Sequence, residues 1–237
     1  MKPDLKNNLI RLFGVSLYVG MMAVGYYYNL TFVQLGLIDL GERVIGMSRV
    51  AVASNMAAMA LMTSLIALAF GTWISRRGFG FYAKLRIAFL VILVQTILTP
   101  LAPNLDSSGA FLAWVIGCSF ALGVGVPVTF GLAVDLVPVG WRGEAAAAIT
   151  ALAYLAANLV PNAWTIEAFT QPLMWVMPAG VIGLGVLAFA PLPFMDQLAQ
   201  QHTIPTFSLG RYSRSATVRM VVLILLMFGV FFVDSLG

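Results

Sequence analysis

Long apolar runs with few charged residues most constrain what this chain can fold into. A helix rises about 1.5 Å per residue, so it needs about 20 mostly apolar residues to cross the roughly 30 Å hydrocarbon core of a bilayer. The runs that satisfy or approach this length are 10–34, 48–74, 84–102, 110–134, 145–164, 173–194 and 217–237. Short segments rich in Gly and Pro separate most of them. The sequence therefore predicts an all-α membrane protein, a polytopic helical bundle.

The composition excludes two other broad classes. Of the 237 residues, 61% are hydrophobic and 9% are charged. A soluble domain averages roughly 45–50% apolar and about 25% charged residues, and a disordered chain is more polar still. Neither class fits this chain.

Few residues of this chain suit catalysis or metal binding. Cys118 and His202 are the only residues of their types, which excludes a disulfide within the chain and a multi-histidine metal site. The sequence also lacks a nucleophile elbow and a glycine-rich phosphate loop followed by lysine. We therefore expect no catalytic residues, no enzymatic activity and no metal or other cofactor.

The basic residues predict how the chain is oriented. Of the 13 Lys and Arg, only Arg43 and Arg49 fall on the side opposite the N-terminus. Membrane proteins retain basic residues on the cytoplasmic side, so we expect a multi-pass protein of the cell (inner) membrane with a cytoplasmic N-terminus. The net charge of +4 then reflects orientation, and we expect no nucleic-acid partner.

Small residues and prolines are dense within the fourth to sixth runs. Glycines such as Gly123 and Gly125, and the alanines of the fifth run, predict closely packed helices, because small residues allow two backbones to approach. Pro127 and Pro161 each lack a backbone donor and are expected to kink their helices.

The fifth run also carries polar residues. Tyr154 and Asn158 are four residues apart and share one helix face. That face could line a groove, or its side chains could form hydrogen bonds between helices.

The connection between the second and third runs carries a resemblance to a known family. Residues 71–85 read GTWISRRGFGFYAKL. This segment resembles the signature loop of the major facilitator superfamily, Gly-x-x-x-Asp-Arg-x-Gly-Arg-Arg, which lies between the second and third helices. Gly71, Arg76 and Gly78 match the pattern, and Ser75 stands where the family has aspartate. The resemblance implies a role for this loop in locking the two halves of a transporter.

The connection between the fourth and fifth runs resembles a second part of the same family. Asp135 precedes Pro138, and Arg142 is followed by Gly143, as in the acidic-x-x-Pro and Arg-Gly pattern that ends the family's fourth helix. The resemblance implies an ion pair between Asp135 and Arg76, with Arg142 in the same set of inner-loop residues.

The resemblance also implies a domain organisation. Residues 1–194 would form a six-helix N-terminal half, 195–216 a cytoplasmic connecting loop, and 217–237 a seventh helix that begins a missing or truncated second half. By resemblance the first, second, fourth and fifth helices would line a substrate cavity. Its candidate residues are Tyr26, Asn55, Tyr154 and Asn158.

Two functions remain open from the sequence. The first is a transporter that moves a small neutral or amphipathic solute by alternating access. Its partners would be the lipid bilayer, the solute, and a second half, a second copy of the chain or a larger membrane complex. The second is a non-transporting membrane subunit on the same scaffold that binds pigment, lipid or a partner complex. Ser75 and the end of the chain at the last residue of the seventh run favour the second.

Overall fold

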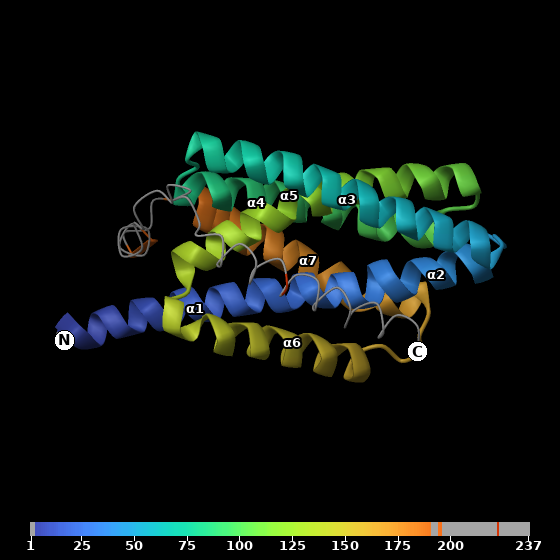
Figure 1. Ribbon diagram of the computed structural model, residues 1–237. Coiled ribbons are helices and arrows are strands. Elements are labelled where there is room, and N and C mark those ends of the chain that lie inside the picture. Colours follow the sequence, from blue (N-terminus) through green and yellow to red (C-terminus); the bar gives the residue numbers. More distant parts are fainter. Residues whose placement is uncertain (1–2, 191–193, 196–221, 223–237) are drawn as a thin grey trace. The chain divides into compact units, whose positions relative to one another are not determined.

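The computed structural model describes residues 3–190, 194–195 and 222 (Figure 1). This part of the chain is helical and contains no strand, which confirms the predicted all-α class. Its helices up to Phe189 belong to one compact unit, Met1–Thr203. The predicted seventh helix at 217–237 and nearly all of the connecting loop at 195–216 lie outside the described residues.

The first helical span is longer than predicted. Helix α1, Pro3–Tyr27, continues through a π-helix, Tyr28–Gly36, then α2, Leu37–Asp39, and a second π-helix, Leu40–Val44. The sequence predicts that this span ends at residue 34. Two glycines in the additional part make room for neighbouring side chains. A Cβ on Gly36 would lie 2.8 Å from Ile166 Cδ1, and one on Gly41 would lie 2.6 Å from Val52 Cγ2.

The next two helices have clear end signals. Helix α3, Arg49–Arg77, begins after Ser48, whose side chain accepts a hydrogen bond from the Ala51 amide. It ends at Gly78, which adopts the left-handed conformation (φ +63°) that favours glycine. Helix α4, Phe81–Leu98, continues into a 3₁₀ helix, Thr99–Asn104. The short connection makes α3 and α4 antiparallel.

The remaining helices lie close to their predicted positions. Helix α5 covers Ser108–Leu136, a 3₁₀ turn covers Val139–Trp141, and α6 covers Arg142–Leu159. Helix α7, Ile166–Phe189, begins before the predicted start at residue 173.

One of the two predicted proline kinks is wrong. Pro127 lies inside α5, but Pro161 follows the end of α6. A proline has no N–H to continue the helix and clashes with the preceding turn, so Pro161 stands after a helix end instead of within a kink.

Several helices are long and apolar enough to cross a bilayer. There are five such segments in the described residues: Asn8–Val44, Arg49–Arg77, Phe81–Asn104, Ser108–Leu136 and Ile166–Phe189. These helices are compatible, by length and composition, with the predicted multi-pass membrane protein. Helix α6 is not among the five. Its 18 residues span about 27 Å at 1.5 Å per residue, and Arg142 and Glu144 lie in its first turn.

The long helices run side by side as a bundle with alternating directions (Figure 1). Helix α1 packs along α6, α3 packs along α5, and α4 contacts both α5 and α7. Gly123 lets α3 and α5 approach closely, since a Cβ there would lie 2.6 Å from Ile66 Cβ. The close helix packing predicted from small residues is confirmed.

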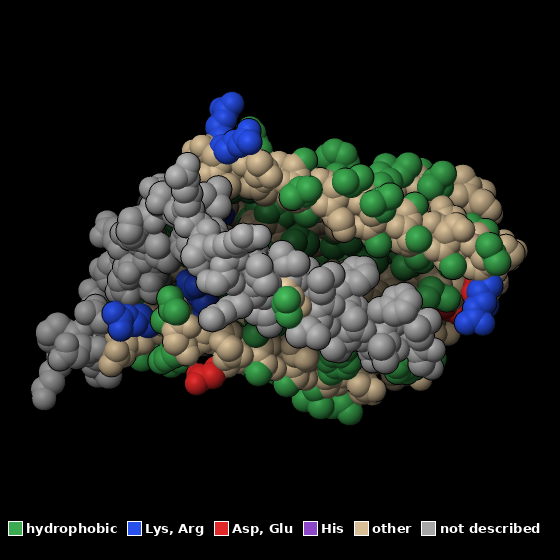
Figure 2. All heavy atoms as spheres, in the orientation of Figure 1, with side chains coloured by type: hydrophobic (Ala, Val, Ile, Leu, Met, Phe, Trp, Pro, Cys, Tyr) green, Lys and Arg blue, Asp and Glu red, His purple; other side chains and the backbone are tan. Residues whose placement is uncertain are grey.

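Charged side chains gather near the two ends of the bundle, and apolar side chains cover the flank between them (Figure 2). This distribution is the one expected for helices that stand in a hydrocarbon layer, because charged groups in the core of the bilayer are costly.

Candidate functional site

A cavity of about 650 Å³ lies in the middle of the bundle. Its walls come from α1 and the start of the following π-helix (16–29), α4 (88–95), α5 (122–129) and α7 (176–187), with Ile149 of α6. The volume falls within the range of roughly 300–1,000 Å³ that is typical of small-molecule sites. The cavity is therefore large enough for a solute of moderate size.

The cavity walls formed by described residues are mostly apolar and carry no charged side chain. The polar side chains among them are Ser16, Tyr26, Tyr28, Asn29, Gln95 and Thr129. Glycines widen two of the walls, because a Cβ added at Gly20, Gly25 or Gly183 would meet nothing within 4 Å. Such a site suits an uncharged molecule, since a charged group would have no counter-charge in the walls.

Only one of the four candidate cavity residues lines this cavity. Tyr26 does so, and its ring centroid lies 6.0 Å from that of Tyr154 on α6 in an edge-to-face contact. Asn55 and Asn158 do not contribute, since each amide donates to a carbonyl of its own helix, at Ala51 and Tyr154 respectively, both at 2.8 Å.

The helices around the cavity also differ from the expected set. Helices α1 and α5 contribute as expected, and α6 contributes one residue. Helix α3 does not contribute, whereas α4 and α7 form two of the walls.

Many polar side chains within the helices are satisfied by their own helix. The hydroxyl groups of Thr31, Ser64, Thr96, Ser119 and Thr150 each donate to the carbonyl four residues earlier, at 2.6–3.0 Å. This pattern satisfies a hydroxyl without a partner on another helix. These residues therefore neither connect helices nor mark a groove.

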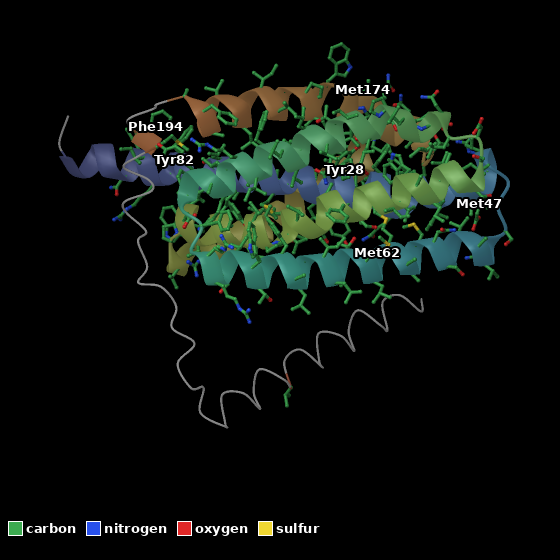
Figure 3. The ribbon with its side chains drawn as sticks, turned by 90° about the horizontal axis from the view of Figure 1, so that it is seen from above. Tyr28, Met47, Met62, Tyr82, Met174 and Phe194 are labelled. Carbon is green, nitrogen blue, oxygen red and sulfur yellow. The ribbon has the colours of Figure 1, made fainter. Side chains whose placement is uncertain are left out.

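Two buried polar contacts do cross between helices. Tyr28, which Figure 3 labels among the helices of the bundle, has its hydroxyl 3.9 Å from Cys118 Sγ. Trp114 Nε1 donates to the Leu98 carbonyl at 2.8 Å. Both contacts involve α5, so they link the first span and the end of α4 to this helix.

The inner loops form a different ion pair from the one predicted. Lys84 Nζ lies 2.6 Å from Asp135 Oδ2, and the two side chains are only 14% and 15% exposed. Arg76 is exposed and has no ion pair within the described residues, so the predicted Arg76–Asp135 pair is wrong for this structure. Gly131 leaves room for the lysine, because a Cβ there would lie 3.0 Å from Lys84 Cδ.

The other inner-loop residues have separate roles. Gly71 packs α3 against α5, where a Cβ would lie 3.2 Å from Pro127 Cβ. Gly78 ends α3, and Ser75 lies exposed in the last turns of that helix. Arg142 Nε donates to the Val137 carbonyl at 3.3 Å. The structure therefore distributes these residues over the two loops without bringing them together as one site.

Arg86 interacts with the C-terminal end of α7. Its Nε donates to the Ala188 carbonyl at 3.4 Å, in the last turn of α7. A basic side chain at this position satisfies an exposed carbonyl and complements the negative end of the helix dipole.

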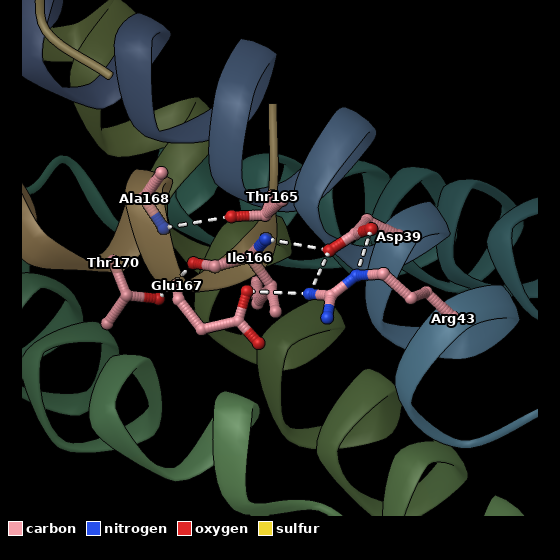
Figure 4. Close-up of polar contacts among 7 residues, drawn as sticks. All are labelled: Asp39, Arg43, Thr165, Ile166, Glu167, Ala168 and Thr170. Atoms are coloured by element: carbon pink, nitrogen blue, oxygen red, sulfur yellow. Dashed lines mark hydrogen bonds and ion pairs between the residues drawn. The ribbon is translucent and has the colours of Figure 1, made fainter. Parts of the chain in front are cut away.

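A charged cluster at the opposite end of the bundle is not predicted from the sequence (Figure 4). Asp39 accepts two hydrogen bonds from Arg43, at 2.7 and 2.8 Å, and a third from the Ile166 amide at 2.9 Å. Arg43 Nη2 also lies 2.6 Å from Glu167 Oε2. Thr165 is the N-cap residue of α7 and accepts from the Ala168 amide at 3.4 Å. Asp39 adds an acceptor for the Ile166 amide, and the cluster links the N-terminus of α7 to the first span. The four-residue spacing of Asp39 and Arg43 is its only sequence signal.

Comparisons of the chain with protein families, with curated proteins and with solved structures found no match.

Proposed function

We propose that the chain is a membrane transporter of the major facilitator type, and that its described helices act as the N-terminal half. It moves a small uncharged solute by alternating access. The observation that carries this proposal is the uncharged cavity of about 650 Å³ with walls from α1, α4, α5 and α7. Ligand sites between the helices of a bundle are common, and transporters place theirs near the midplane of the bilayer.

The neighbour relations of the helices support this proposal. Helix α1 packs along α6, and α5 packs along α3, while α4 and α7 contact each other. The first three helices (α1, α3, α4) correspond in this order to the last three (α5, α6, α7). Under this correspondence the pair α1–α6 is equivalent to the pair α5–α3, and both pairs are in contact. Units of three helices have opposite directions in the membrane, so this correspondence describes an inverted repeat. Inverted repeats are a common basis of alternating access.

The distribution of basic residues supports a cytoplasmic N-terminus in a cell membrane. Arg43 and Arg49 belong to one end of the bundle, and Arg76, Arg77, Lys84, Arg86 and Arg142 belong to the other end, where α1 begins. The second group is the larger one, and basic residues are retained in the cytoplasm.

Uptake into liposomes tests the proposal. The full product of the gene is reconstituted, and a panel of uncharged solutes is measured against empty liposomes. We expect saturable uptake of at least one solute, and at least a tenfold loss of that uptake in Gly183→Trp, which fills the cavity. The control is Gly109→Trp at the start of α5, where a new side chain also meets nothing within 4 Å. Uptake at the leak rate for every solute would contradict transport.

A second function has one observation in its favour. The resemblance implies an aspartate at position 75 and a pair between Arg76 and Asp135, but position 75 is serine and Asp135 pairs with Lys84. A subunit that binds pigment, lipid or a partner complex would not need the lock. Copurification with a larger complex, together with the absence of uptake, would favour this function.

A further inference from the structure

We infer that the cavity binds an uncharged, mainly apolar molecule that carries one hydrogen-bonding end, and that the carboxamides of Asn29 and Gln95 hold this end. The inference rests on the proposed function for its site and adds the chemical class of the ligand. An alcohol, a ketone or an amide with a hydrocarbon body belongs to this class.

The two amides are the cavity's available hydrogen-bonding groups. Asn29 and Gln95 both line the cavity and are half-buried, and neither side chain forms a hydrogen bond with another residue in the described part of the chain. A carboxamide offers both donors and an acceptor. Each of them can therefore pair with a hydroxyl or a carbonyl group of a ligand.

Most other polar groups of the cavity already have a partner. Thr129 Oγ1 donates to the Val126 carbonyl at 2.8 Å, and the Tyr28 hydroxyl lies 3.9 Å from Cys118 Sγ. The Tyr26 side chain forms a hydrogen bond with that of Tyr154, in addition to the edge-to-face contact of their rings. Ser16 is exposed and lies more than three helical turns before Asn29 on the first span. The polar part of the ligand site is therefore at the two amides.

A chain of contacts places the two amides at the same level of the bundle. Phe32 lies about one turn after Asn29, and its ring centroid is 5.7 Å from that of Trp114. Trp114 in turn donates to the carbonyl of Leu98, about one turn after Gln95. The amides thus stand on two walls of the cavity near one end of its lining.

The absence of charge in the walls determines the class of ligand. Among the described residues that line the cavity there is no Lys, Arg, Asp or Glu. Burial of an ionised group without a partner is far more costly than burial of a hydroxyl or an amide that gains a hydrogen bond. A carboxylate or an ammonium group is therefore disfavoured, and the apolar walls accommodate the hydrocarbon body.

Photo-crosslinking of the purified chain tests this inference. The probes are three molecules with the same medium-length hydrocarbon chain and the same diazirine, ending in a primary alcohol, a carboxylate or a trimethylammonium group. Mass spectrometry maps the labelled peptides. We expect the alcohol to label the cavity segments of α1, α4 and α7, and excess unlabelled alcohol to suppress this labelling. We expect at least tenfold less labelling there by the two charged probes.

Near-isosteric variants test the role of the amides. Asn29→Leu and Gln95→Met each remove hydrogen-bonding capacity with little change in volume. We expect labelling at low probe concentration to fall about fivefold for each variant and more than tenfold for both together. Matched controls are Asn158→Leu and Gln171→Met, at exposed positions away from the cavity, which should label as the original chain does. Thermal unfolding in detergent confirms that each variant is folded.

The outcomes separate this inference from the proposed transport. Equal cavity labelling by the charged probes, or unchanged labelling in the folded double variant, would overturn the inference even where the liposomes show saturable uptake. Selective alcohol labelling that depends on both amides, without uptake of any solute, would support the ligand site and contradict transport.

Discussion

The Lys84–Asp135 ion pair links the start of α4 to the end of α5. Both side chains are largely buried and lie 2.6 Å apart, so removal of one leaves the other charge without a partner. We expect Lys84→Met to lower the free energy of unfolding by about 3 kcal/mol. Chemical or thermal unfolding in detergent measures the change.

Arg76→Ala is the matched control for this pair. Arg76 is exposed and has no ion pair among the residues that the structure describes, so its loss should change stability by less than about 0.5 kcal/mol. If Arg76→Ala destabilised the protein as strongly as Lys84→Met, the structure would have assigned the wrong partner to Asp135.

Asp39 forms an ion pair with Arg43 and accepts a hydrogen bond from the Ile166 amide. Two substitutions can separate these contributions. Asp39→Ala removes the acceptor of the Ile166 amide and the contact with Arg43, while Thr165 still caps α7, and should cost about 2 kcal/mol. Asp39→Asn keeps an oxygen that can accept from the Ile166 amide, so it should cost about half as much. Thermal unfolding in detergent ranks the stabilities of the original chain, Asp39→Asn and Asp39→Ala. Equal stability of Asp39→Ala and the original chain would show that these contacts contribute nothing.

The sequence predicts single-residue roles only where the partner is local. The predicted connection at 75–80 contains Gly78, which ends α3 in the structure. Asp135 lies 51 positions from Lys84, and Asp39 lies 127 positions from Ile166. Such partners depend on how the helices pack against one another. The apolar pattern of the sequence does not determine this packing.

Gly123 determines how closely α3 and α5 can approach. A Cβ there would lie 2.6 Å from Ile66 Cβ and 3.0 Å from the Thr63 carbonyl oxygen, so one of the helices must shift. We expect Gly123→Ala to destabilise the fold by about 1–3 kcal/mol. Thermal unfolding in detergent measures this loss.

Gly183→Ala is the control for the packing prediction. It adds the same methyl group in the middle of α7, where nothing lies within 4 Å. It should be neutral or stabilise the protein by up to about 1 kcal/mol, because alanine favours the helix more than glycine does. A comparable loss of stability in both variants would mean that glycine substitution itself, and not helix contact, is the cause.

The elements themselves are largely predictable, but their ends are less so. Apolar runs identify each described helix, because bilayer thickness sets their length. The first span extends to Val44, and Gly36 and Gly41 within it contact side chains of other helices. Helix α7 begins at Ile166, after the local N-cap residue Thr165, and distant Asp39 accepts a further hydrogen bond from the Ile166 amide. The contacts of Gly36, Gly41 and Asp39 join distant parts of the chain, which a local pattern does not contain.

The cavity is a property of the whole bundle and is its least predictable feature. Its walls join residues from α1, α4, α5 and α7. Of the residues proposed for it from the sequence and the resemblance, Tyr26 lines it, whereas Asn55 and Asn158 donate to their own helices. Polarity within a span does not by itself indicate a site, because a side chain can be satisfied by its own backbone.

The number of membrane crossings depends on α6, whose ends can be located by labelling. A bundle with an inverted repeat needs α6 to cross, yet α6 is not one of the described segments that are long and apolar enough by themselves. Its packing along α1 supplies apolar contacts that compensate for its short length and its polar first turn. We therefore expect α6 to cross the bilayer together with α1.

Single cysteines on either side of α6 test this expectation. Gly140→Cys and Asn162→Cys place exposed thiols before and after the helix, and the natural Cys118 is buried and should stay unlabelled. In intact cells, a membrane-impermeant maleimide should label Asn162→Cys, and should label Gly140→Cys only after the membrane is opened. Ser75→Cys and Asp106→Cys provide the inner and outer references. Labelling of residues 140 and 162 from the same side would remove one crossing, and with it the inverted repeat on which alternating access by this bundle depends.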